Sequence, residues 1–247
     1  VAVERRNGPS FSGWYMCGLC EQRYHGVVYC ALGWACWKTY MGRPEADRVR
    51  ILAMEQLGNG LYVARHHEDA LSVREAELSM RRRVGASEEG DMLIVQGNLA
   101  TTYARLGRDE ESLRMRQEVY SGRLKLHGEE HRATLRDAFN YANSLARLGR
   151  FEEARSLLRR TLPVVRRVAR EGNEVSIRMK TLYAQSLYHD AAATLADLRE
   201  AVTTLEETER TARRVLGGAH PTTSAIEEPL QHARARLRAY ETPSGSA

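Results

Sequence analysis

The 247-residue sequence predicts an all-α fold, a right-handed α-solenoid built from helix pairs with a 42-residue period. Three observations predict it. Similar segments begin at Leu57, Leu99 and Tyr141, each 42 residues after the one before. Small residues recur at matching places in these segments, and glycine recurs where the first helix of a pair should end. An internal repeat of this length is typical of solenoids, in which stacked helix pairs share a continuous core.

The three segments read LGNGLYVARHHEDAL, LATTYARLGRDEESL and YANSLARLGRFEEAR. Small residues mark the places where two helices should approach closely, and larger residues should fill the space between helices. The small ones are Gly58, Ala100 and Ala142 in the first helices and Ala70, Ser112 and Ala154 in the second; the large ones are Leu61, Tyr103 and Leu145. Gly107 and Gly149 should end their helices, because glycine adopts the left-handed conformation of a helix C-terminus.

A fourth copy begins near LYAQSLYHD, where Ala184 lies 42 residues after Ala142. Its second small residue, Ala201, lies 47 residues after Ala154, so we expect a longer turn or helix end around AAATLAD. A terminal helix should follow through AIEEPLQHARARLRAY, with a kink at Pro229.

Two joints between repeats share the pattern G-x-x-H-x-x-T, in LHGEEHRAT and LGGAHPTT. Gly128 and Gly217 suit a helix C-cap, and Pro221 suits the first turn of the helix that follows. The sequence therefore predicts three parts. Residues 1–43 are a cysteine-containing segment with a capping helix, residues 44–241 are about four helix pairs plus a terminal helix, and residues 242–247 are a flexible tail.

Composition limits the classes of partner. The formal net charge is +5, but arginine and glutamate alternate at helical spacing, which is typical of a solvated helix face rather than a nucleic-acid surface. The longest apolar run, Val27 to Trp37, is too short to span a membrane. All four cysteines lie between Cys17 and Cys36, which favours a reducing, cytoplasmic location.

The sequence begins with Val1 rather than Met, and we expect a fragment or a processed product.

The segments GNLATTYARLGRDEESL and NYANSLARLGRFEEA and the joint LGGAHPTT resemble the tetratricopeptide repeats of kinesin light chains, over roughly Leu52 to Tyr240. That family also has a heptad coiled coil for motor attachment. No heptad run occurs here, so the resemblance does not extend to motor attachment. It implies a concave groove lined by the first helices, in which asparagines hold an extended peptide by its backbone and basic residues bind its acidic side chains.

The second asparagine of the family's N-N-L-A pattern falls on Asn98 and Asn140, with Gln56 in the first repeat. Leu182 occupies this place in the fourth repeat and departs from the pattern. The next inward positions are Asn59, Thr101, Asn143 and Gln185. Arginines open and close the same face, at Arg136, Arg178, Arg105 and Arg147.

These amides and arginines suggest a groove for an acidic or carboxylate-bearing peptide, bound by bidentate arginine contacts. Asparagine suits the task because its amide can donate to and accept from an extended backbone. The alternative is a set of ordinary solvated polar residues. The implied binding residues are Asn59, Asn98, Arg105, Arg136, Asn140, Asn143, Arg147, Arg178 and Gln185.

Cys17 and Cys20 have the spacing of a zinc-binding pair. His25 and Cys30 would complete a local knuckle, although the usual glycine before the histidine is missing. Alternatively, W-x-x-C-x-x-C-x-x-x-Y resembles the closing end of a RING-variant domain, with its other ligands upstream. That resemblance implies a ubiquitin ligase whose repeats read the substrate. The third interpretation is four thiols without a metal.

The sequence does not indicate an enzyme. It contains no nucleophile–base–acid set and no glycine-rich phosphate loop, and no histidine has a partner at a catalytic spacing. His66 and His67 should lie in a solvated turn, while His131 and His220 belong to the joints. The sequence therefore predicts a protein-binding scaffold without an obligatory cofactor.

Overall fold

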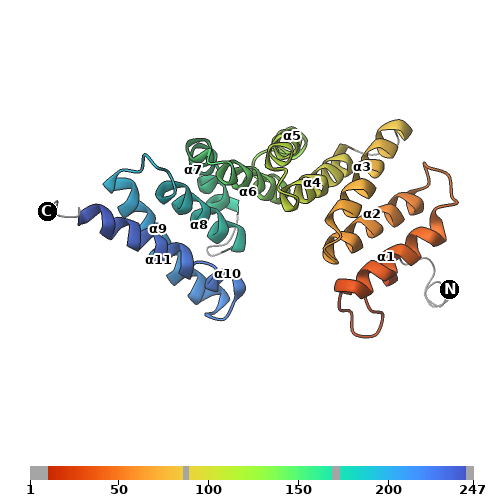
Figure 1. The fold of residues 1–247 in the computed structure, drawn as a ribbon, viewed down its shortest axis with the longest axis horizontal. Helices are drawn as coiled ribbons and strands as arrows, with labels where there is room; N and C mark the ends of the chain where they lie inside the picture. Colours follow the sequence, from red (N-terminus) through yellow and green to blue (C-terminus); the bar gives the residue numbers. More distant parts are fainter. Residues whose placement is uncertain (1–10, 86–88, 169–172, 243–247) are drawn as a thin grey trace. The chain divides into compact units, whose positions relative to one another are not determined.

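The computed structural model describes residues 11–85, 89–168 and 173–242, and most of them are helical (Figure 1). Within these ranges the only β-pairing is a single bridge between Met16 and Arg23. The all-α prediction is therefore confirmed. Of the predicted tail, all but Thr242 lies outside the described residues. No helix in the described ranges is long and apolar enough to cross a bilayer.

A short 3-10 helix precedes eleven α-helices in the described residues. Their bounds are η1 Phe11–Trp14, α1 Gly26–Tyr40, α2 Arg48–Val63, α3 His67–Val84, α4 Glu89–Arg105, α5 Asp109–His127, α6 Arg132–Arg147, α7 Phe151–Val168, α8 Glu174–Tyr188, α9 Leu195–Leu216, α10 Pro221–Ser224 and α11 Glu227–Glu241. The predicted pairs correspond to α2 with α3, α4 with α5, α6 with α7, and α8 with α9. The second helices α3, α5 and α7 begin 42 residues apart.

The helices form two compact units, Val1–Met115 and Arg116–Ala247, with the boundary inside α5. In the first unit α1 packs on α2, α2 on α3 and α3 on α4. In the second unit α6 packs on α7, α7 on α8, and α8 and α11 on α9. From α1 to α4 and from α6 to α9, successive helices thus contact each other, as expected for stacked pairs whose apolar faces are buried only by stacking.

Two glycines bring α1 unusually close to α2. A Cβ at Gly33 would lie 2.9 Å from the carbonyl oxygen of Gln56, and one at Gly60 would lie 2.9 Å from the Cα of Cys30. The contact is extended by a buried cluster in which Trp14 and Cys36 pack with Tyr40. The capping helix predicted within residues 1–43 therefore corresponds to α1 and lies directly against α2.

The small positions predicted from the repeat are buried. Ala100, Ala142 and Ala184 have no exposed surface, and neither do Ala70, Ala154 and Ala201. Gly107 and Gly149 have φ values of +73° and +71°, as predicted for helix ends, and Arg65 adopts φ +67° at the matching place of the first pair. An arginine in this conformation is strained, because its Cβ crowds the backbone.

The histidines of the two joints cap helices. The Nδ1 of His131 accepts a hydrogen bond from the backbone N–H of Ala133, at 3.2 Å, and His220 does the same for Thr222. Asp47 and Asn173 occupy the same place before α2 and α8 and accept from the residue two positions on. The sequence pattern located these joints, but the capping role of histidine was not foreseen.

Two further details concern the fourth repeat and the C-terminal end. The turn between α8 and α9 spans residues 189–194, against three residues in each earlier pair, so the extra residues lengthen this turn. The predicted kink at Pro229 is wrong. The chain breaks earlier, between α10 and α11, and Pro229 is the third residue of α11, where the missing N–H needs no partner within the helix.

Candidate functional site

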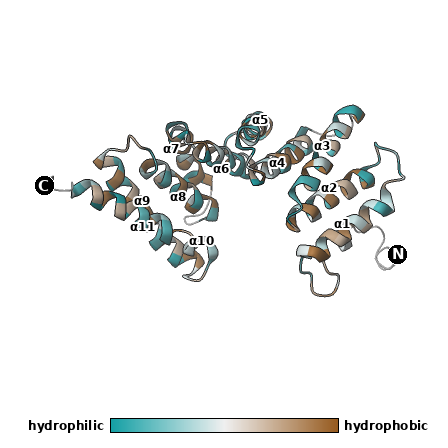
Figure 2. Cartoon of the chain, viewed as in Figure 1, coloured by the Kyte–Doolittle hydropathy of each residue, from teal (hydrophilic) through white to brown (hydrophobic). Residues whose placement is uncertain are grey.

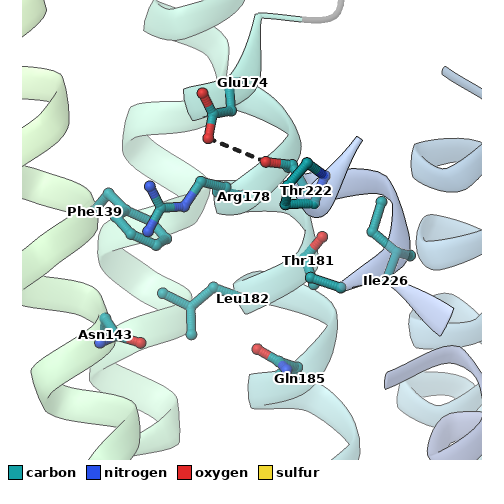
Figure 3. Close-up of a pocket in the computed structure, with 11 residues that line it drawn as sticks. Phe139, Asn143, Glu174, Arg178, Thr181, Leu182, Gln185, Thr222 and Ile226 are labelled. Carbon is teal, nitrogen blue, oxygen red and sulfur yellow. Dashed lines mark hydrogen bonds between the residues drawn. The ribbon is translucent and has the colours of Figure 1, made fainter. Parts of the chain in front are cut away.

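A cavity of about 330 Å³ lies in the second unit, lined by α6, α8 and the start of α10 (Figure 3). Three residues predicted for peptide binding share it: Asn143 from α6 and Arg178 and Gln185 from α8. The repeat register explains why they meet, because Asn143 and Gln185 hold the same position in adjacent first helices. Two amides and a guanidinium therefore face one cavity.

The cavity has an apolar floor that the sequence did not suggest as a site. Phe139 and Leu182 line it, together with Ile226. The guanidinium carbon of Arg178 lies 4.7 Å from the centroid of the Phe139 ring, in a cation–π contact. The N–H donors of a guanidinium lie in its plane, so stacking on a ring leaves them directed outward. The combination suits a ligand with both an apolar and an anionic group.

The rim of the cavity is closed on one side by a contact between α8 and α10. The hydroxyl of Thr222 donates to Glu174 Oε1 at 3.0 Å (Figure 3). Glu174 is the acidic group nearest the α10 end of the lining, while Arg178 lies one turn further along α8. An anion would therefore be favoured at the Arg178 side of the cavity and disfavoured at the Glu174 side.

The remaining predicted residues of the second unit lie on α6 outside the cavity lining. Arg136 and Arg147 are exposed, and Asn140 is half-buried. The Nε of Arg136 lies 3.6 Å from Asp137, whose other oxygen accepts from Arg123 at 3.2 Å. Part of the positive field of Arg136 is thus offset by a neighbouring carboxylate.

In the first unit, Asn59 and Asn98 meet at a buried arginine. Arg74 Nη2 donates to Asn59 Oδ1 at 2.9 Å, and Nη1 donates to the carbonyl oxygen of Asn98 at 2.8 Å and to the Thr102 hydroxyl. Its guanidinium also lies 5.0 Å from the Tyr62 ring. Burial lowers the pKa of Arg74 below its usual value. The Asn59 side-chain oxygen therefore has a structural partner inside the repeat stack.

Arg105 joins the same group from α4, since its Nε donates to the Tyr62 hydroxyl at 3.1 Å. The sequence did not single out Arg74, although a signal existed. Arg74 lies four residues after the buried Ala70 and four before the buried Leu78, so it is a charged residue on an apolar helix face. Such a position requires internal partners.

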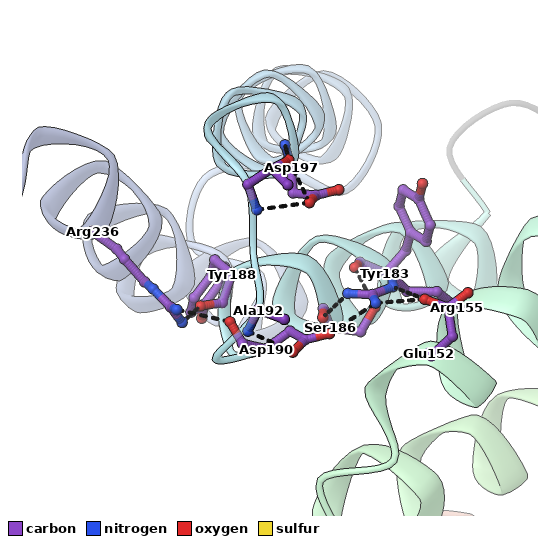
Figure 4. Close-up of polar contacts among 10 residues, drawn as sticks. Glu152, Arg155, Tyr183, Ser186, Tyr188, Asp190, Ala192, Asp197 and Arg236 are labelled. Carbon is purple, nitrogen blue, oxygen red and sulfur yellow. Dashed lines mark hydrogen bonds and ion pairs between the residues drawn. The ribbon is translucent and has the colours of Figure 1, made fainter. Parts of the chain in front are cut away.

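A second buried arginine network holds α8 in place. Arg155 of α7 donates to the carbonyl oxygen of Ser186 at 3.0 Å and to Asp190 at 2.8 Å, and Arg236 of α11 donates to the carbonyl oxygens of Tyr188 and Asp190 (Figure 4). These bonds attach the C-terminal end of α8 to α7 and α11. They fix the helix that carries Arg178 and Gln185.

The cysteines of residues 17–36 lie in different surroundings. Cys17 and Cys20 lie in a hairpin closed by backbone bonds between Cys17 and Gln22 and between Tyr24 and Tyr15. Backbone N–H groups of Cys20 and Leu19 lower the pKa of Cys17 to about 7. Burial raises the pKa of Cys36 to about 12.

The described residues contain no group of three or more histidine, cysteine or acidic side chains placed to hold a metal. A metal at Cys17 and Cys20, with or without His25 and Cys30, stays a prediction. Nothing in the comparisons below supports the interpretation as a ubiquitin ligase.

Residues 91–167 match the tetratricopeptide repeat family. None of the curated proteins matches the chain. Among solved structures, nearly identical TPR-like repeats of a Podosopora anserina kinesin light chain are 19% identical, with a TM-score of 0.65, over 78% of this chain and 88% of that one. BtubC (BKLC) from P. vanneervenii is 15% identical, with a TM-score of 0.64, over 89% and 95% of the two chains.

A Rap protein complexed with competence and sporulation factor is a more distant match, 12% identical with a TM-score of 0.53 over 85% of this chain and 59% of that one. At these identities the likeness shows the fold. The family match and the helix bounds agree in placing repeats over α4 to α7. Residues 91–167 therefore match tetratricopeptide repeats, and the described helices have the fold of the repeat solenoids of kinesin light chain-like proteins.

Proposed function

We propose that this protein is an interaction scaffold that binds an extended acidic peptide segment, with the cavity between α6 and α8 as the main site. Tetratricopeptide repeats generally serve protein–protein interaction, and solenoids present extended surfaces to their partners. The observation that carries the proposal is the convergence of Asn143, Arg178 and Gln185 on one cavity.

The chemistry of the lining matches an extended peptide. A peptide strand outside a sheet presents unpaired N–H and C=O groups, and Asn143 and Gln185 can each donate to and accept from them. A carboxylate beside that backbone would meet the N–H edge of Arg178, in a bond stronger than one between neutral groups. Phe139 and Leu182 provide apolar surface for the neighbouring side chain. In the first unit, Asn98 and Arg105 lie on α4, which is the first helix of its pair, as α6 and α8 are of theirs.

The similar Rap structure was obtained in complex with competence and sporulation factor, and we infer by analogy that a partner of this chain binds on its repeats. No cofactor or reaction is part of the proposal.

The proposal can be tested with a library of random extended peptides displayed on beads. The intact chain should retain peptides rich in aspartate and glutamate. Arg178→Ala should weaken binding of a retained peptide by about tenfold or more, since a hydrogen bond to a charged group contributes about 1.5–3 kcal/mol. Arg210→Ala is the matched control, because Arg210 is an exposed arginine on the second helix α9.

A double variant tests the asparagines independently. Asn98→Ala with Asn140→Ala should weaken peptide binding while the far-ultraviolet circular dichroism stays that of the parent chain. Unchanged binding in this variant, together with equal affinities of the Arg178 and Arg210 variants, would show that the first helices do not carry the site.

A further inference from the structure

Helix α1 has an exposed apolar face on the side away from α2. Val27 is 78% exposed, Val28 52% and Trp34 43%, and Ala31 and Ala35 are exposed as well. Lys38 is the only charged residue of this 15-residue helix. Figure 2 shows the hydrophobic colour along the N-terminal half of α1. A helix that is apolar on all sides is normally buried on all sides.

The repeat register shows which interface this face corresponds to. α3 begins at His67, and the residue 42 positions earlier, His25, is the N-cap of α1. α1 therefore holds the register of a second helix. The residues matching Val28 are Ala70, Ser112 and Ala154, all at most 1% exposed. Those matching Ala35 are Glu77, Val119 and Thr161, all at most 6% exposed. In later repeats, this face is covered.

The residues beside this face are also more apolar in α1 than at the matching positions of later repeats. Val27 matches Asp69, Glu111 and Glu153, and Trp34 matches Ala76, Glu118 and Arg160. Later second helices thus have an acidic residue where α1 has a valine, and a charged residue or an alanine where α1 has a tryptophan. The exposed face of α1 is apolar beyond what stacking on α2 requires. It continues the helix–helix interface of the stack.

The face is symmetric about Ala31. Val27 and Val28 lie four and three residues before it, and Trp34 and Ala35 lie three and four residues after it. When two copies of such a helix cross antiparallel at Ala31, the valines of one meet the tryptophan and alanine of the other, and the small residue allows close approach. The same patch on both subunits is the arrangement of a two-fold dimer. No charge of this face opposes like charge across the axis.

We propose that the chain self-associates through this face, with α1 of two copies packed antiparallel around Ala31. The occupant is a second copy of this chain, because the face is complementary to itself and its one charged residue, Lys38 near the end of α1, does not meet the Lys38 of the other copy. One helix pair buries less than a standard protein interface, so the dimer should form in the micromolar range. The inference is independent of peptide binding.

Sedimentation equilibrium of the intact chain tests the proposal. The parent should show a monomer–dimer equilibrium, and Val27→Glu with Trp34→Glu should weaken dimerisation by about a hundredfold, because each glutamate would be buried in the interface. Both substitutions are compatible with the fold, since Glu111 and Glu118 occupy the two matching positions of α5. Val215→Glu, at an exposed valine of α9, is the control and should leave the equilibrium unchanged.

A cross-link tests the geometry. In a Cys17→Ser and Cys20→Ser background, Ala31→Cys should give a disulfide-linked dimer under mild oxidation, and Thr39→Cys at the far end of α1 should not. A monomeric parent at tens of micromolar would overturn the proposal. So would a dimer that persists in the double glutamate variant, or one that is cross-linked equally well from residue 39.

Discussion

Gly60 determines how closely α1 approaches α2. A Cβ there would lie 2.9 Å from the Cα of Cys30 and 2.9 Å from the carbonyl oxygen of Tyr29, both backbone atoms that cannot rotate away. A Cβ at Gly58, one half-turn earlier on the same helix, would lie 3.3 Å from the side-chain Cγ of Arg74. The two glycines are similar in sequence and differ in what surrounds them.

Gly60→Ala should therefore lower the free energy of unfolding by about 1–3 kcal/mol, as overpacking does in a dense interior. Gly58→Ala should cost less than Gly60→Ala, because its Cβ would meet the Arg74 side chain at 3.3 Å rather than a backbone atom at 2.9 Å, and alanine favours the helix by up to about 1 kcal/mol. Urea denaturation followed by tryptophan fluorescence would measure both. Equal losses in the two variants would contradict the close α1–α2 packing.

Residues at repeat positions were the most predictable from sequence. Ala100 and Ala142 recur at one spacing, so their burial followed from the period. Arg74 and Phe139 were not predicted, because each depends on a neighbour in another helix. The sequence shows a charged or aromatic residue at such a position but does not show which group it contacts.

At the scale of the element, buried charges link neighbouring helices. Glu77 of α3 is 2% exposed and pairs with Arg81 at 2.8 Å. Burial, opposed by Arg81 and reinforced by Glu55, raises the pKa of Glu77 to about 7. The folded chain then holds a proton that the unfolded chain has already released, so the free energy of unfolding falls as pH rises from about 4.5 to about 7.

Glu77→Gln should remove this part of the pH dependence. The difference in unfolding free energy between parent and variant should change by about 3 kcal/mol across that interval, at about 1.4 kcal/mol for each pKa unit. Denaturation at a series of pH values would measure it. A difference that stays constant with pH would show that Glu77 titrates normally.

The Arg155 network makes α8 depend on α7. Arg155→Ala would leave the buried carbonyl oxygen of Ser186 and the carboxylate of Asp190 without this donor, so we expect a loss of about 3 kcal/mol in unfolding free energy. Arg159→Ala is the matched control, since Arg159 lies one turn on and bonds the Tyr183 hydroxyl in a partly exposed place. Its loss should be below about 1 kcal/mol, the usual size of a hydrogen bond that is not fully buried. Thermal denaturation of both variants would measure the two losses in unfolding free energy.

Helix positions were predictable because stacking requires amphipathic helices at fixed spacing. The ends of the helices were less predictable from the sequence. Pro229 was expected to kink a helix, yet it lies in the first turn of α11, and only the surrounding structure shows where the preceding α10 stops. The capping histidines were likewise visible as a pattern but not as a bond, because histidine is not among the usual N-cap residues.

At the scale of the whole molecule, the formal net charge of +5 favours an acidic ligand. Affinity for an acidic peptide should fall as salt is added, because the screening length drops from about 10 Å at 0.1 M to about 3 Å at 1 M. Isothermal titration at several salt concentrations would show it, and Arg178→Ala should have a shallower dependence. An affinity that does not vary with salt would argue for apolar binding alone.

The candidate site was predictable in part. The repeat register indicated that Asn143 and Gln185 share a face, and Arg178 was implied by the family resemblance. The apolar floor combines Phe139 of α6 and Leu182 of α8 with Ile226, and the Glu174–Thr222 contact joins α8 to α10, whose position relative to α8 no local pattern specifies.

The central claim is that a peptide binds where Asn143, Arg178 and Gln185 converge. Nuclear magnetic resonance of the side-chain amides, recorded as a selected acidic peptide is added to the intact chain, tests it most directly. The signals of Asn143 and Gln185 should shift together and saturate, and in Arg178→Ala they should need about tenfold or more peptide for the same shift. Shifts confined to the second helices α7 and α9, with the Asn143 and Gln185 signals unmoved, would contradict the claim.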